Sequence, residues 1–63
     1  MKISYDPEVD VLSVLLNDNP IEESDEDRPG LILDHDADGN VVGIEVLNAS
    51  MRVDNPLEYA ARS

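Results

Sequence analysis

The segment from Asp34 to Glu45 contains residues whose types and spacing could bind a metal ion. Counted from Asp34, acidic side chains stand at the first, third and fifth places, glycine at the sixth, an aliphatic residue at the eighth and Glu45 at the twelfth. This is the order of an EF-hand calcium loop, in which carboxylate and carbonyl oxygens converge on one ion. The chemistry that this string suggests is reversible binding of a divalent cation.

The residues that flank the string favour a β-hairpin over an EF-hand. Helices enter and leave an EF-hand loop, but here Pro29–Gly30 precedes it and residues 42–47 alternate as a strand does. In an extended strand Glu45 would lie more than about 15 Å from Gly39, too far to bind an ion held by the acids before Gly39. The sequence therefore predicts a turn at Asp36–Gly39, of type I with a glycine bulge.

A weaker cation site, made by the turn alone, remains as an alternative. Its ligands would be Asp34, Asp36 and Asp38, because three neighbouring carboxylates repel one another and a divalent ion would relieve that repulsion. His35 lies between two of these acids and is the single histidine of the chain. One histidine does not make a site, and we expect it to be exposed on a loop.

The rest of the sequence offers no catalytic constellation. It has no cysteine, which excludes disulfides, thiolate nucleophiles and cysteine-ligated zinc. It also has no glycine-rich phosphate loop and no serine or threonine in a recognisable nucleophile pattern. We therefore expect that the protein is not an enzyme and that it binds no cofactor.

The charge of the chain indicates which partners it attracts. Acidic residues number 15 against 4 basic ones, which gives a formal net charge of -11. Phosphate backbones and anionic lipids are bound mainly through Lys and Arg, so we expect neither nucleic acid nor membrane as a partner. The same charge would steer a basic protein towards this one, or simply keep a small protein in solution.

Signals for export or membrane insertion are not recognisable in the sequence. The first residues reach Asp6 and Pro7 before any apolar stretch long enough for a signal peptide. The longest apolar run, Val14 to Leu16, is far shorter than the roughly 20 residues that span a bilayer. Together with the lack of cysteine, these features predict a cytoplasmic protein.

The length of the chain allows a single domain, residues 1–63, and its patterns predict an α+β fold. We expect a small antiparallel sheet of three or four strands within residues 1–50, built from two hairpins. One hairpin spans residues 2–16 around a turn at Asp6–Pro7, and the other spans residues 31–46.

Two further segments have distinct compositions. Residues 22–27 are almost all acidic and predict a loop or a short edge strand, where charge discourages pairing with stray strands. Residues 51–63 form a C-terminal segment in which Asn55 and Pro56 predict the start of a short helix. Such a helix is too short to persist alone, so it must dock on the sheet or on a partner.

The strand predicted at residues 10–16 is apolar on both faces, and such strands are usually covered on both sides. A core built from fewer than about 70–80 residues seldom supplies more than about 3–5 kcal/mol, and small domains often add a second chain. We therefore predict a protein–protein interaction module that forms a homodimer. Its predicted interface includes Val11, Leu15, Leu57 and Tyr59.

Several short motifs together resemble the bacterial and archaeal family called domain of unknown function 2283. They cover roughly the first fifty residues, and their positions are Tyr5–Glu8, Pro29–Gly30, Ile32–Asp34, Asp38–Glu45 and Leu47–Ser50. The resemblance implies a compact, prokaryotic, cytoplasmic β-sheet domain with no established activity and no catalytic residues to carry over. It also implies an antitoxin-like role, because some such acidic proteins look like partners of basic, toxin-like proteins.

Overall fold

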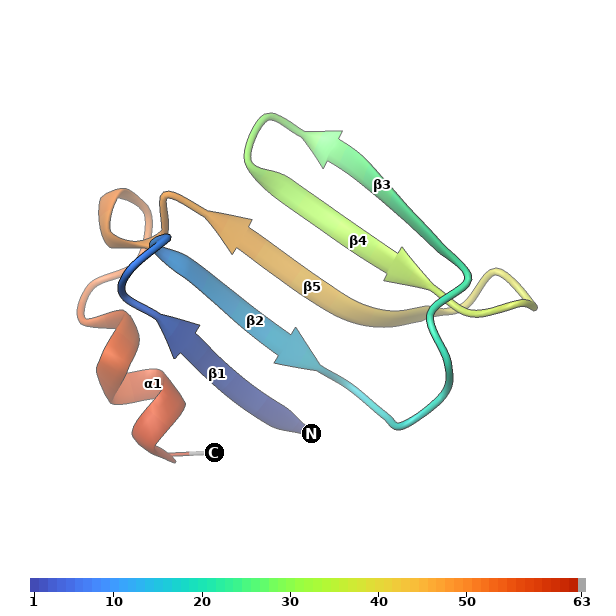
Figure 1. Ribbon diagram of the computed structural model, residues 1–63, viewed down its shortest axis with the longest axis horizontal. Coiled ribbons are helices and arrows are strands. Elements are labelled where there is room, and N and C mark those ends of the chain that lie inside the picture. The colour runs from blue at the N-terminus through green and yellow to red at the C-terminus, as the bar shows by residue number, and fades with distance from the viewer. Residues whose placement is uncertain (63) are drawn as a thin grey trace.

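Five antiparallel strands form one sheet in the computed structural model, which describes residues 1–62 (Figure 1). A short 3-10 helix and a C-terminal α-helix follow the last strand. The strands are β1 (Lys2–Asp6), β2 (Val11–Leu15), β3 (Glu23–Arg28), β4 (Leu31–His35) and β5 (Val41–Leu47), and the helices are η1 (Ala49–Met51) and α1 (Pro56–Arg62). The predicted α+β class is confirmed, and the sheet has five strands where three or four were expected.

The strands lie in the order β1-β2-β5-β4-β3, so the last strand in the sequence is the central one in the sheet. After β2 the chain passes the ends of β5 and β4 through residues 16–22, here called the crossing loop, and starts β3 at the far edge (Figure 1). The additional strand is β3, which confirms the edge-strand alternative for the acidic segment. All six of its side chains are exposed.

Both predicted turns are present, and local hydrogen bonds hold them. In the first, the Asp6 carboxylate accepts the backbone N–H of Glu8 at 3.0 Å. In the second, the carbonyl of Asp36 accepts the N–H of Gly39 at 3.1 Å, and Gly39 has the positive φ of 84° that a glycine bulge requires. The segment that resembles a calcium loop is therefore the β4–β5 hairpin.

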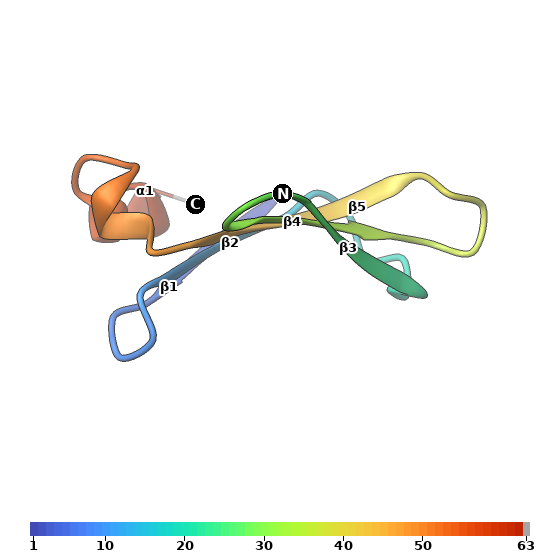
Figure 2. The same ribbon diagram turned by 90° about the horizontal axis from the view of Figure 1, so that it is seen from above.

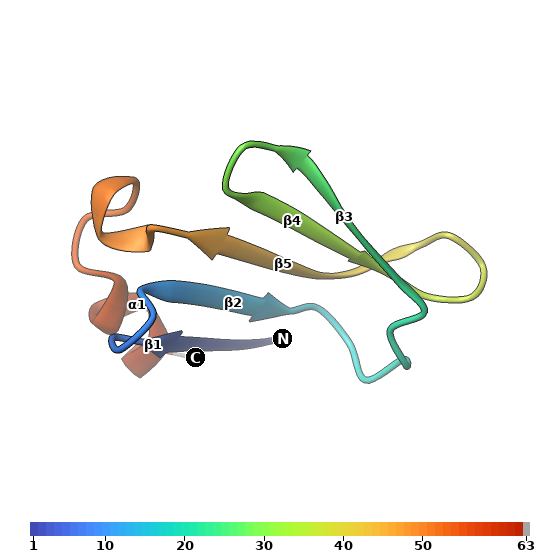
Figure 3. The ribbon, with the colours of Figure 1, turned by 45° about the horizontal axis from the view of Figure 1, so that its top comes forward.

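Residues 51–62 lie at one end of the sheet, beside the β1–β2 turn, while the crossing loop and the β4–β5 turn lie at the other end (Figure 3). The helix starts at Pro56, as predicted, and the carbonyl of Asn55 accepts the N–H of Glu58 at 2.9 Å. Its main contact is with β1. The side chain of Arg52 reaches back and donates to the carbonyl of Pro29 at 2.6 Å.

The two faces of the sheet differ in composition. Helix α1 lies on one side and the crossing loop on the other (Figure 2). On the helix side, two rows of aligned residues cross the three inner strands, and we call their six members the apolar face: Leu12, Val46 and Leu31, then Val14, Ile44 and Leu33. The loop side, here called the polar face, mixes charged and hydroxyl residues with the apolar Leu15 and Ile32. Its polar members are Lys2, Ser4, Ser13, Glu45, Asp34 and Ser24.

The core of this single-layer molecule is thin. Among the described residues, the fully buried hydrophobic side chains are Leu12, Val42 and Ala49, and most of the apolar face is half-buried. The radius of gyration is 11.6 Å, against about 10.6 Å expected for a compact chain of this length. The accessible surface of 4465 Å² likewise exceeds the roughly 4,000 Å² typical of this mass. Several large apolar side chains elsewhere are exposed, among them Leu16, Ile21, Met51 and Leu57.

Candidate functional site

A buried carboxylate lies at the centre of the polar face. Asp34 on β4 is only 4% exposed, which is rare for an aspartate. Its neighbour on β3, Ser24, donates its hydroxyl to Asp34 Oδ1 at 2.6 Å. Its neighbour on β5, Gly43, leaves the space for the other oxygen, because a Cβ at Gly43 would stand 2.9 Å from Asp34 Oδ2. The β4–β5 register shifts just beyond Asp34, where His35 pairs with Val41.

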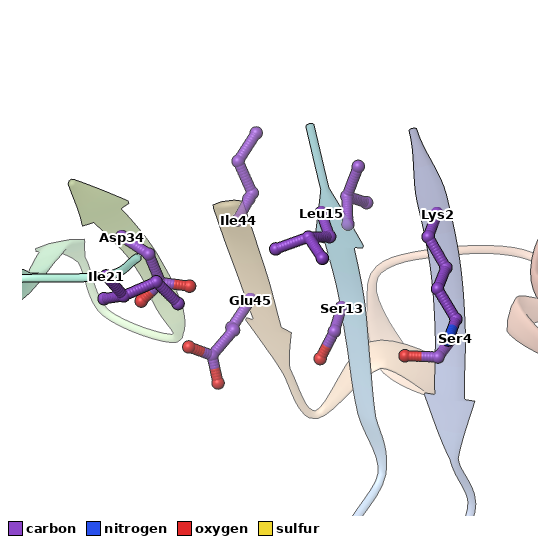
Figure 4. Close-up of a pocket in the computed structure, with 9 residues that line it drawn as sticks. Lys2, Ser4, Ser13, Leu15, Ile21, Asp34, Ile44 and Glu45 are labelled. Atoms are coloured by element: carbon purple, nitrogen blue, oxygen red, sulfur yellow. The ribbon is translucent and has the colours of Figure 1, made fainter. Parts of the chain in front are cut away.

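A second acid, Glu45 of β5, faces Asp34 on the same side of the sheet (Figure 4). Burial raises the pKa of Glu45, and its hydrogen bond with Asp34 and the negative charge of Asp34 raise that pKa further. A hydrogen bond between two carboxyl groups requires a proton on one of them. Glu45 therefore keeps its proton to a higher pH than an exposed glutamate does.

The pair lies in a shallow groove of about 300 Å³ across the polar face. Ile21 of the crossing loop lies near the acids at one end, and Lys2 and Ser4 of β1 line the other end (Figure 4). The groove combines the two carboxyl groups with hydroxyl groups and one amine. Carboxyl, hydroxyl and amine groups of this kind can hydrogen-bond a polar or cationic group.

The structure does not bring the three predicted cation ligands together. The carboxylate of Asp36 accepts the backbone N–H groups of Asp38 and Asn40, both at 2.9 Å, and the side-chain amide of Asn19 at 3.3 Å. These bonds, that from Asn40 above all, lower the pKa of Asp36. Asp38 is exposed, and Asp34 is occupied within the sheet. Within residues 1–62, no group of three or more acidic or histidine side chains is arranged to hold a metal ion.

We expected His35 on an exposed loop, but the structure does not place it there. It is the last residue of β4, and its side chain is only 23% exposed. The Nδ1 atom is buried, lies 4.0 Å from a carboxylate oxygen of Asp25 and has no hydrogen-bond partner. The expectation failed because the strand continues two residues beyond the apolar triplet Leu31–Leu33.

Asp10 is a tethering residue that the sequence analysis missed. It has a φ of 57° at the end of the first turn. Its carboxylate accepts the hydroxyl of Tyr5 at 2.6 Å and the hydroxyl of Ser50 at 2.7 Å. The bond from Tyr5 lowers the pKa of Asp10, and the same bond raises the pKa of Tyr5. Asp10 thus connects the motif at Tyr5–Glu8 with the motif at Leu47–Ser50, forty residues away.

The four predicted interface residues do not form one surface. Val11 and Leu15 are half-buried on the polar face. Leu57 and Tyr59 belong to α1 on the other side of the sheet and are 61% and 45% exposed. A second chain that covered all four would have to reach around the β1 edge. The six residues of the apolar face, by contrast, are direct cross-strand neighbours on one side of the sheet.

Comparison with known proteins identifies the family. No curated protein and no solved structure matches the chain significantly. No helix in residues 1–62 has the length and apolar character needed to cross a membrane. The family described as protein of unknown function (DUF2283) matches residues 2–50, which run from β1 into η1 and include the Asp34–Glu45 pair and Asp10. The chain therefore belongs to the DUF2283 family.

Proposed function

We propose that this protein is a small acidic protein–protein interaction module that works as a homodimer and acts by binding, without catalysis, in the cytoplasm. The observation that carries the proposal is the single-layer sheet, whose apolar face has one short helix beside it, packed mainly against β1. Within residues 1–62 the structure places no second sheet or further helix against that face. A second layer is the usual way in which a sheet buries such a surface.

Light scattering coupled to size-exclusion chromatography tests this proposal, at tens of micromolar protein and moderate salt. We expect a mass of twice the 6.9 kDa of one chain. Sedimentation equilibrium over a range of concentrations then gives the dissociation constant. A monodisperse species of one chain at these concentrations would exclude the homodimer.

An antitoxin-like role, in which a basic protein binds the module, is supported by the edge strand β3. Unpaired backbone N–H and C=O groups on an open edge accept another strand. The acids of β3 repel a second copy of this chain and attract a basic strand: Glu23, Asp25, Glu26 and Asp27. A basic partner therefore suits this edge better than self-pairing does.

Co-purification from the native host, followed by mass spectrometry, tests the basic partner. We expect a basic protein whose retention falls as salt is raised, because screening weakens charge attraction. The test variant has Glu23, Asp25 and Asp27 changed to Ser, which removes three charges from β3 while leaving its backbone able to pair with β4. Retention of the same partner by this variant would contradict binding at β3.

Cation binding by Asp34, Asp36 and Asp38 has less support, since turn amides occupy Asp36 and Ser24 occupies Asp34. Isothermal titration with Ca²⁺ and Mg²⁺ decides this alternative. We expect no heat of binding at millimolar metal. A saturable heat that Asp38→Ala abolishes would restore the cation site.

A further inference from the structure

We infer that the homodimer forms by face-to-face stacking of two sheets, with a second copy of this chain seated on the apolar face. This inference rests on the proposed self-association and adds to it the surface, the symmetry and the layer arrangement. The surface lies on the opposite side of the sheet from Val11 and Leu15, the two strand residues that the sequence analysis assigned to the interface.

The apolar face is continuous across the three inner strands. Leu12, Val46 and Leu31 are direct cross-strand neighbours, and Val14, Ile44 and Leu33 form the next row. None of the six is charged, and all but Leu12 are half-buried. Such aligned apolar rows are what the inner faces of a β-sandwich contain.

The charge of the chain selects this face for self-association. Each copy has a net charge of -11, so two copies repel wherever acidic surfaces meet. A two-fold dimer places the same patch of both chains in contact, so the patch must be self-complementary. The six residues of the apolar face meet that condition, and the acid beside them on the same side is Asp25 of the edge strand β3, next to Leu33. The opposite face contains Asp34 and Glu45 on the inner strands and Glu26 on β3.

The dimensions of the molecule fit the same arrangement. The chain measures 33 × 25 × 16 Å, so its whole broad side, with α1 and the edge strands included, is comparable to the about 800 Å² that each partner buries in a standard interface. Sheets stack about 10 Å apart, which would convert two thin slabs into one compact body. The excess radius of gyration and accessible surface of the single chain would then disappear.

Helix α1 fixes where the second sheet can lie. Because α1 stands on the helix side against β1, the partner sheet must sit over β2, β5 and β4 (Figure 2). The exposed side chains of Leu57 and Tyr59 would then flank the partner and extend the apolar contact. These two predicted interface residues keep their role in this arrangement.

Two matched leucine variants test the choice of face. Leu33→Lys places a charge on the apolar face, and Leu15→Lys makes the identical substitution at a half-buried position on the polar face. Circular dichroism first establishes that each variant is folded, and light scattering then gives its mass. We expect Leu33→Lys to be monomeric and Leu15→Lys to remain dimeric. A folded Leu33→Lys that stays dimeric overturns the inference.

Cross-linking gives a second test, in which no charge is placed on the apolar face. The chain has no cysteine, so single cysteines can be introduced at Ile44 on the apolar face and at Glu45 on the polar face. With a short bis-maleimide we expect covalent dimers from Ile44→Cys and few from Glu45→Cys. Equal or reversed yields overturn the stacked arrangement. A monomeric wild-type chain would instead refute the proposed function itself, so the two failures are distinguishable.

Discussion

The carboxyl group of Asp34 lies over the backbone of Gly43, its direct partner on the neighbouring strand, at a place where no other residue would leave room for it. A Cβ at position 43 would stand 2.9 Å from Asp34 Oδ2 and 3.5 Å from both Asp34 Cβ and the Val14 carbonyl oxygen. The glycine thus determines that an acid can be buried in the centre of the polar face.

We predict that Gly43→Ala lowers the free energy of unfolding by about 1–3 kcal/mol, the usual cost of overpacking a tight site. Urea denaturation measures this loss. In an Asp34→Ala background the methyl group no longer meets a carboxylate, so the cost of Gly43→Ala should fall markedly, which a double-mutant cycle detects. Equal costs in both backgrounds would show that the contact with Asp34 is not the cause.

Glu45→Gln should stabilise the protein at neutral pH. The folded state raises the pKa of Glu45, so its contribution to stability is complete below about pH 4.5 and is lost as the pH rises through the raised pKa. Glutamine cannot ionise, so the variant escapes this loss. We expect a melting temperature several degrees above wild type near pH 7 and no advantage near pH 4. Glu26→Gln, on the exposed edge strand, is the control for loss of one charge.

Asp36→Ala should loosen the β4–β5 turn. The pKa of Asp36 is lowered from 3.8, so its contribution is present above that pH and is lost in acid as the pH falls through the lowered pKa. We expect faster hydrogen exchange at the amides of Asp38 and Asn40, and a stability loss that shrinks in strong acid. Asp38→Ala removes an equal charge from the same turn, and exchange as fast in that variant would contradict the assignment.

The Tyr5–Asp10 hydrogen bond should be visible in the phenol titration. The carboxylate of Asp10 raises the pKa of Tyr5 above 10.0, chiefly because it accepts a hydrogen bond from the Tyr5 hydroxyl group. With Tyr59→Phe as the background, ultraviolet absorbance follows Tyr5 alone. We expect Asp10→Asn to shift the midpoint down towards 10.0 and Ser50→Ala to leave it raised. An unchanged midpoint in Asp10→Asn would show that the bond does not control this titration.

Local sequence signals predicted the turns and the start of the helix. Asp6–Pro7, Asp36–Gly39 and Asn55–Pro56 each act through backbone preferences of neighbouring residues, which are readable without a fold. The alternation in β5 likewise reflects its own two faces. The hairpins and the α+β class could therefore be predicted from the sequence.

Other features depend on pairing between distant segments, and local patterns do not encode them. Strand β3 has no apolar alternation, because neither of its faces is buried, so its extended form depends on pairing with β4. Asp34 is buried because the register places Ser24 and Gly43 beside it. The tether at Asp10 joins residues forty positions apart. The positive φ of Asp10 is likewise invisible in the sequence, because no glycine stands there.

The position of β5 between β2 and β4 has a consequence for how the chain folds during synthesis. Until residue 47 has been made, a nascent chain contains two separate hairpins that share no strand, and an isolated hairpin is marginal in water. Insertion of the final strand joins both halves in one cooperative event. Truncation before β5 should therefore leave an unfolded chain. During synthesis the two hairpins should remain accessible to proteases until β5 has been made.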